Sequence, residues 1–292
     1  MYKRQIYRYL REYYNYKNPL YFFTQDNFFA LPEIQESCPR NICSFDDEWI
    51  TKHQDKDGFI KLSDFKEQFD NDFKKAGVDF YKTYDYYKEN NPQLSKEAME
   101  KKDFKLEFCQ IYTLEIWYVS ARLYNSLNGL EQKDFLENYL PKIEYLMTKT
   151  PYITMENILA DLEDKKIKIV KGTMDIQNID GKFKTSTKNN DIYTSDKIFN
   201  AQGFEKDLSK AIKNIKLLEN LYKNRLIESD FKDNINVAYP SYNPITTKYG
   251  QIKNLYINGM WTASVDISNN DLRSVLISSM EMANDFMNNL KK

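Results

Sequence analysis

Glu115 is a carboxylate in an apolar setting. It lies within the stretch DFKLEFCQIYTLEIWYVSARLYNSLN, residues 103–128. A carboxylate buried among apolar side chains has a raised pKa and can take part in acid–base catalysis. Buried polar groups are more often paired, and the expected partner is a nearby Arg or a Tyr hydroxyl. We therefore expect a paired, structural carboxylate at Glu115, with Arg122 two turns further along.

A second group of residues that could do chemistry is the acidic stretch HQDKDGFIKLSD, residues 53–64. It resembles the calcium-binding loop of EF-hand proteins, over this one loop and its flanking helices. The resemblance places Gly58 at the sixth position, where the loop bends sharply. The calcium ligands that it implies are Asp55, Asp57, the Phe59 carbonyl and Asp64.

The loop also departs from the EF-hand pattern. His53 replaces the first Asp, and a hard cation disfavours an imidazole ligand. Asp64 is one methylene shorter than the usual Glu, and Lys61 places a positive charge beside the ninth position. We therefore expect weak calcium binding at best, with a dissociation constant of about 10⁻⁴–10⁻³ M. In the alternative interpretation, residues 55–58 form a tight turn between two helices.

Two further stretches could form a binding surface. Lys206, Lys210 and Lys213 begin a row of lysines that could bind phosphates along a groove. Acidic residues are interspersed with them, which favours an ordinary solvated face. Tyr239 and Tyr242 lie in a loop rich in Pro and aromatics that could stack on sugars or bases. The alternative there is a connection stiffened by proline.

The composition argues against several functional classes. The 292 residues include 42 Lys and Arg against 43 Asp and Glu, so no global charge attracts the chain to nucleic acid or to an anionic membrane. Apolar residues make up 41% and charged residues 29%, which is typical of folded rather than disordered proteins. No apolar run is long enough for a transmembrane helix. The sequence also lacks the P-loop, GxSxG, GxGxxG and HExxH signatures.

Two features bear on origin and compartment. MYKRQ, residues 1–5, resembles the translation of a transposon adapter used for sequencing libraries. These residues would then be non-native, in a metagenomic reading frame that starts upstream; the alternative is an ordinary basic N-terminus. A missing signal peptide is accordingly no argument for the cytoplasm.

Three cysteines, Cys38, Cys43 and Cys109, cannot all pair within one chain, which favours thiols in a reducing compartment over a Cys38–Cys43 disulfide.

The elements that must position these residues are mainly helices. Apolar side chains recur at three- and four-residue steps through residues 103–128, which predicts a long central helix that other elements cover and that Gly129 ends. Helices are also predicted on both sides of the acidic loop. The central-helix side chains that we expect to be buried are Phe108, Ile111, Ile116, Val119 and Leu123.

After Asp164 the sequence changes in character. Alternating residues around Asp180-Gly181 predict a β-hairpin with polar strands. Asn258-Gly259 predicts a second hairpin, in which residues 255–257 pair with residues 260–262. Residues 203–228 are predicted as one helix. A last helix follows, with Asn269 or Asn270 as its N-cap. Its core-facing stripe is predicted to be Leu272, Val275, Leu276, Ala283, Phe286 and Leu290.

The predicted fold is α+β and predominantly α-helical. A helical part, residues 1–163, carries the central helix, and a smaller mixed part, residues 164–292, carries two β-hairpins and two helices; these are one compact domain or two. The leading hypothesis is a non-enzymatic binding or structural protein, from a mobile element or an uncultured bacterium, whose partner is another protein. The alternatives are a calcium-binding helical module and a hydrolase or nuclease with a carboxylate-based site.

Overall fold

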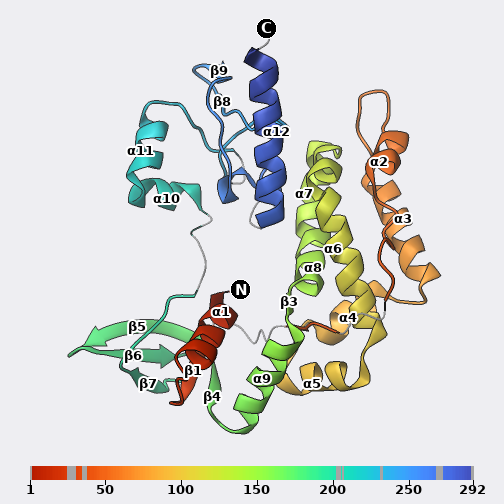
Figure 1. The fold of residues 1–292 in the computed structure, drawn as a ribbon. Helices are drawn as coiled ribbons and strands as arrows, with labels where there is room; N and C mark the ends of the chain where they lie inside the picture. Colours follow the sequence, from red (N-terminus) through yellow and green to blue (C-terminus); the bar gives the residue numbers. More distant parts are fainter. Residues whose placement is uncertain are drawn as a thin grey trace. The chain divides into compact units, whose positions relative to one another are not determined.

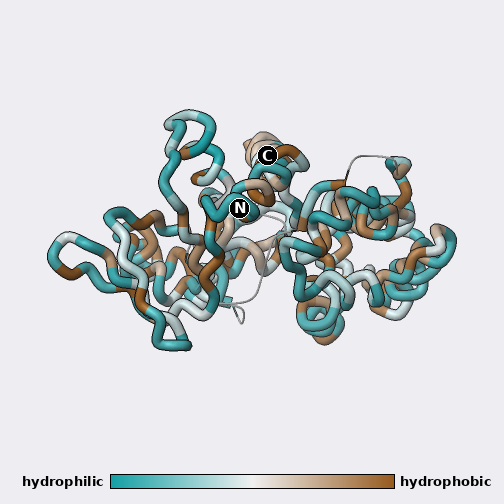
Figure 2. Tube along the Cα trace, turned by 90° about the horizontal axis from the view of Figure 1, so that it is seen from below, coloured by the Kyte–Doolittle hydropathy of each residue, from teal (hydrophilic) through white to brown (hydrophobic). Residues whose placement is uncertain are grey.

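The computed structural model describes residues 2–24, 31–34, 38–201, 205, 207–230, 233–267 and 272–290. Most of these residues lie in helices, and the sheets have two or three strands (Figure 1). The predicted α+β, predominantly helical class is therefore confirmed. Apolar residues occur in short runs along the described trace (Figure 2). No helix in this part of the chain is long and apolar enough to cross a membrane.

The chain divides into two compact units, each built from three stretches of sequence. Unit 1 comprises residues 1–42, 71–113 and 139–203, and unit 2 comprises residues 43–70, 114–138 and 204–292. This division does not follow the boundary expected at residue 164. Strand β1 (Leu20–Thr24) pairs in parallel with β4 (Ile167–Lys171), so backbone hydrogen bonds join the two sides of that boundary within unit 1.

Unit 1 contains most of the strands. Besides β1 and β4, β2 (Leu31–Pro32) pairs with β3 (Lys149–Thr150), and β5 (Thr173–Ile179), β6 (Lys182–Thr187) and β7 (Ile192–Ser195) form an antiparallel sheet. Its helical segments are α1 (Tyr2–Arg8), η1 (Tyr9–Tyr13), α4 (Phe80–Tyr87), α5 (Pro92–Lys101), α8 (Leu140–Met147) and α9 (Tyr152–Glu163).

Among the described residues, two α-helices contribute to both units. They are α3 (Leu62–Lys75) and the central helix α6 (Phe104–Asn125). In unit 1 the Phe73 ring packs edge-on against Phe108 and Tyr112, with centroid distances of 5.2 and 4.7 Å. The Tyr112 hydroxyl donates to the buried Asp72 carboxylate at 2.8 Å. This bond satisfies a carboxylate that would otherwise be costly to bury.

The central helix is buried much as its sequence predicts. Phe108, Ile111, Ile116 and Leu123 are at most 5% exposed. Val119 is only partly buried, contrary to expectation. Gly129 does not end this helix: it begins α7 (Gly129–Asp134), whose first N–H groups donate to the Asn128 side chain. The helix stops at Asn125, where the following backbone turns to pair with another loop.

Unit 2 holds α2 (Asp47–His53), most of η2 (Phe135–Tyr139), α10 (Leu208–Asn214), α11 (Lys216–Lys223), η3 (Met260–Thr262) and α12 (Leu272–Leu290). Strands β8 (Ile245–Thr246) and β9 (Gly250–Gln251) form a small hairpin. One core cluster consists of Leu208, Ala211, Leu218, Ile227, Ile235, Val237, Tyr242 and Met282. The single helix expected over residues 203–228 is two helices, divided at the extended residue Ile215.

One of the two predicted hairpins is confirmed. Asp180 and Gly181 join β5 to β6 with φ of 51° and 77°, as a two-residue turn with left-handed residues requires. The second prediction is wrong, because residues 255–257 are not a strand and Met260–Thr262 is a 3₁₀ helix. The Asn258 side chain accepts from the Gly259 N–H at 2.7 Å and donates to Ser279 at 2.8 Å. The Asn258 side chain therefore binds α12, and the dipeptide does not form a hairpin turn.

Candidate functional site

The acidic loop lies between α2 and α3, as predicted. Gly58 bends it with φ of 86°. The Asp55 carboxylate accepts from the Asp57 and Phe59 N–H groups at 2.9 and 3.0 Å, and the Asp55 N–H donates to the Phe59 carbonyl at 2.8 Å. Within the described residues, no three His, Cys, Asp or Glu side chains are grouped to hold one metal ion. The structure therefore does not bring Asp55, Asp57 and Asp64 together as one ligand set.

The same loop is held to the connection between α6 and α7. Ile60 is 1% exposed, and its N–H donates to the Ser126 carbonyl at 2.8 Å. The Leu62 N–H donates to Glu131 at 3.0 Å. His53 stacks on Trp49 at 4.1 Å and is hydrogen-bonded through Nδ1 to the Trp49 carbonyl. The loop is thus a well-supported turn whose histidine packs on its own helix.

Glu115 is paired, as expected, but with a backbone group. Its Oε2 accepts from the Cys43 N–H at 2.8 Å. Arg122 instead forms an ion pair with Asp47 at 2.6 Å and donates to Thr51 at 3.0 Å. Cys38, Cys43 and Cys109 are thiols rather than disulfides. A structural role for Glu115 accounts for its geometry.

The described residues of the two expected binding surfaces differ in exposure. Lys206 lies outside the described residues. Lys210 and Lys213 are exposed on α10, and Lys210 pairs with Asp207 at 3.4 Å, as on a solvated face. Tyr239 is partly buried. Tyr242 is 1% exposed and belongs to the core cluster, which corrects its assignment to a surface. Its ring is buried because neighbouring apolar residues pack around it.

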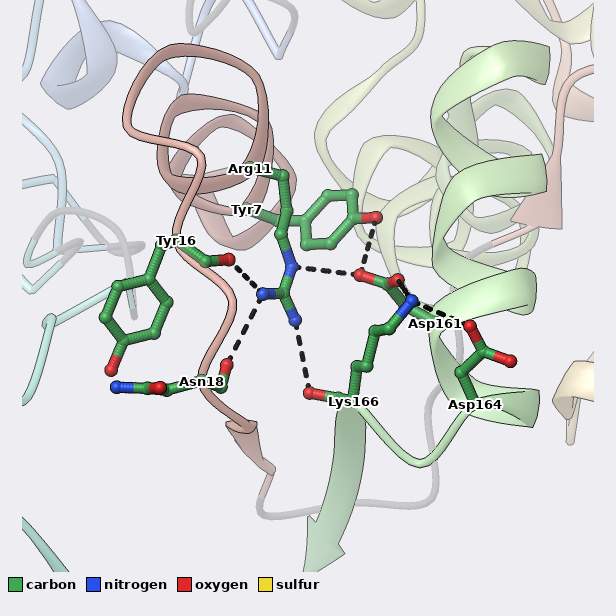
Figure 3. A network of polar contacts seen from close by, with 7 residues as sticks. All are labelled: Tyr7, Arg11, Tyr16, Asn18, Asp161, Asp164 and Lys166. Carbon is green, nitrogen blue, oxygen red and sulfur yellow. Dashed lines mark hydrogen bonds and ion pairs between the residues drawn. The ribbon is translucent and has the colours of Figure 1, made fainter.

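A polar network fastens the N-terminal segment of unit 1 (Figure 3). Arg11 Nε pairs with Asp161 at 2.9 Å, and its Nη atoms donate to the backbone carbonyls of Tyr16, Asn18 and Lys166. The Tyr7 hydroxyl also donates to Asp161, at 3.2 Å. Burial and the Asp161 charge raise the pKa of Tyr7, so its phenol keeps the donated proton. An open hollow of about 290 Å³ adjoins this network, but the Arg11 donors are already engaged by the protein.

Two acidic residues of unit 2 lie near each other, the buried Asp266 and the partly buried Glu281. The Tyr242 hydroxyl donates to Asp266, which is 3% exposed, at 3.2 Å. Burial raises the pKa of Glu281, and the Asp266 charge raises it further. Burial and Glu281 together raise the pKa of Tyr239 to about 12. Three convergent carboxylates would favour a carboxylate-based hydrolase or nuclease. Here two, Asp266 and Glu281, lie beside Tyr242, and no third acidic residue is grouped with them within the described residues.

The packed side of α12 is unexpectedly polar. Ser274 and Ser278 are buried together with Met282. Ser278 donates to the Asn258 side chain at 3.0 Å. Tyr256 donates to Asp285 at 3.1 Å. These contacts, together with the burial of Met282 in the core cluster, orient the helix on unit 2.

The opposite side of α12 is apolar and exposed. We call it the outward face, defined as Leu276, Met280, Ala283, Met287 and Leu290. Leu276 and Met280 are each 60% exposed, Met287 52% and Leu290 66%. On a helix of 3.6 residues per turn, their spacing of four, three, four and three places these side chains on one stripe.

The charged residues of α12 do not lie on the outward face. The Arg273 guanidinium stacks over the Tyr118 ring at 3.5 Å. Asp285 accepts from Tyr256, and Glu281 lies near Asp266 and Tyr242. A surface helix normally turns its charged residues to water. Here Glu281 and Asp285 lie toward unit 2, and the exposed Arg273, one step of the same spacing before Leu276, is engaged by Tyr118. The stripe from Leu276 to Leu290 itself carries no charge.

The predicted core-facing stripe of α12 does not face the core. Of the residues predicted to face the core, four are exposed, namely Leu276, Ala283, Phe286 and Leu290, and Val275 is partly buried; the side chain of Leu272 lies outside the described part. The signal that could have revealed the inversion is the scarcity of charge between residues 272 and 290. A helix with so few charges leaves little to form a solvated face. The network around Asp161 has no comparable signal, because its residues are far apart in sequence.

No protein-family model matches this sequence and no curated protein matches it significantly, so function is inferred from the geometry of the side chains.

Proposed function

We propose that this chain is a non-enzymatic binding protein that binds another protein through the outward face of α12. The observation that carries the proposal is the inverted polarity of this helix. Serines and the charged side chains engage unit 2, while Leu276, Met280, Met287 and Leu290 face solvent. Single exposed apolar residues are normal on a protein surface. A contiguous stripe of them marks an interaction site more often than a solvated surface.

The chemistry of the outward face favours a protein partner. It carries no lysine or arginine to neutralise phosphates, which nucleic-acid binding requires. Its two methionines, Met280 and Met287, are flexible and polarizable and adapt to an apolar partner surface. The apolar spacing is that of a helix that packs against another helix or into a hydrophobic groove.

The test compares methionines on opposite sides of the same helix. We expect the double variant Met280→Lys and Met287→Lys to retain the stability of the parent, because both side chains are already in water. The control, Met282→Lys, buries a charge in the core cluster and should be destabilised by several kcal/mol. Urea denaturation at high dilution, where association does not contribute to stability, measures both. An outward-face variant that is destabilised as much as Met282→Lys would overturn the proposal.

Peroxide oxidation of the dilute protein gives a second measurement. Met280 and Met287 should oxidise about as fast as Met174, which is 68% exposed on β5, and faster than Met282, which is 9% exposed. Exposure governs how quickly a thioether is oxidised. If Met280 and Met287 are protected in the isolated chain, the outward face is covered intramolecularly and no partner is needed.

Weak calcium binding by the acidic loop is the second candidate function. It is favoured by the helix, loop and helix around Gly58, whose positive φ provides the required bend. Calorimetric titration with calcium should give a dissociation constant of about 10⁻⁴–10⁻³ M that weakens in Asp57→Ala. Asp70→Ala, outside the loop, is the control. No heat in the parent protein would leave the loop as a turn.

A further inference from the structure

We propose that the partner of the outward face is a second copy of this chain, paired antiparallel through α12. This inference rests on the proposed function and specifies its partner. Apolar residues that alternate at steps of four and three repeat every 3.5 residues on average. That repeat is characteristic of two helices that wrap around each other with interlocking side chains. The stripe keeps it from Leu276 to Leu290, over two heptads.

The charge on α12 favours self-association. Residues that flank the stripe in such pairs normally carry charges that select one partner and repel others. Here the flanking residues are Ile277, Ser279, Asn284 and Phe286. Two identical faces therefore meet without like charges. A different helix that selects its partner by charge would find no charged residue to pair with at these flanking positions.

Side-chain volume favours the antiparallel arrangement. In that arrangement Met280 lies opposite Ala283 of the second copy, and Leu276 lies opposite Met287. Each large residue in the central layers then fits against a small one, which fills the interface evenly. A parallel pair would set Ala283 against Ala283 and Met280 against Met280, leaving a thin layer beside a crowded one. Two-fold symmetry repeats each contact, as expected of an isologous interface.

The test begins with the mass of the full chain by sedimentation equilibrium across a range of concentrations. We expect the mass of two chains at high concentration, falling to that of one on dilution. Oxidation of Met280 and Met287 should slow with association to near the rate of Met282, whose burial does not depend on a partner. Ile153→Glu, on an exposed position of α9, should leave the dimer intact and controls for an added charge.

Charge complementation tests the orientation. Leu276→Glu alone and Met287→Lys alone should each be monomeric, and their mixture should form a heterodimer, because the antiparallel pair sets these positions opposite each other. A dimer by each variant alone would overturn the arrangement. A parent chain that stays monomeric with freely oxidised Met280 would refute self-pairing and leave the proposed function standing. Protection of Met280 in the monomer would refute the proposed function itself.

Discussion

Replacing Arg11 with Met should loosen the N-terminal segment of unit 1. The Arg11 guanidinium joins η1 to Asp161 on α9 and to the carbonyl of Lys166, just before β4 (Figure 3). Methionine keeps much of the aliphatic stem and removes only the donors. The same Lys166 carbonyl accepts from the Leu20 N–H at 2.9 Å, where the pairing of β1 with β4 begins. The substitution therefore removes one side of a junction between three elements.

The magnitude follows from the burial of the pair. The side chains of Arg11 and Asp161 are 14% and 16% exposed. Removing one partner of a buried ion pair costs about 3–5 kcal/mol. Asp161 retains the Tyr7 hydroxyl at 3.2 Å and the Lys166 ammonium at 3.8 Å, so its charge is not left alone. We therefore expect a loss of about 2–3 kcal/mol in the local free energy of opening.

Amide hydrogen exchange measures this local stability. A loss of about 2–3 kcal/mol corresponds to exchange about 30- to 150-fold faster for the protected amides of β1, including Leu20. The matched control is Arg8→Met on the preceding turn. Arg8 pairs with Glu12, but their side chains are 51% and 37% exposed, so exchange should not change measurably. Equal exchange in the two variants, or unchanged exchange in Arg11→Met, would refute the assignment of Arg11 as the fastener.

Three further predictions can be checked independently. Ile116→Ala should cost about 2–5 kcal/mol in urea denaturation, whereas Ile153→Ala, at a position 69% exposed, should cost little. Burial and Asp266 raise the pKa of Glu281 above the ordinary 4.5, so the folded state holds a proton that the unfolded state releases. Stability should therefore fall as pH rises through and above 4.5, and Glu281→Gln should abolish this decline in denaturation series at stepped pH. Gly181→Ala, at φ of 77°, should cost about 1–2 kcal/mol by thermal unfolding, and an unchanged melting temperature would contradict a left-handed turn.

The sequence predicted an element well where neighbouring residues determine that element. The burial of Ile116 follows from the helical repeat of its neighbours, and the turn at Asp180 and Gly181 follows from the backbone freedom of those residues. Asn258-Gly259 carries the same turn signal as Asp180-Gly181 but does not form a hairpin. Its side-chain partner is Ser279, on a helix that no short window of sequence could include.

The candidate site was harder to predict because an apolar stripe is a binding surface only if that side of the helix faces away from the core. The repeat of apolar residues in α12 identifies a stripe but not its direction. The direction depends on contacts of the other side, such as those of Ser278 with Asn258 and of Asp285 with Tyr256. The usual assumption that an apolar stripe faces inward therefore assigned the wrong side of this helix to the core.

The polar docking of α12 also explains how the outward face can stay outward. Burying leucine and methionine is favourable, so a helix free to rotate would turn its apolar stripe toward its own unit. Each hydrogen bond on the packed side contributes only about 0.5–1.5 kcal/mol, but a buried donor or acceptor left without a partner costs more. Rotation by half a turn would break the bonds of Asn258 and Tyr256 together and pull Arg273 from the Tyr118 ring. The polar contacts therefore contribute less to overall stability than to fixing the rotation of the helix, which keeps the stripe available to the proposed partner.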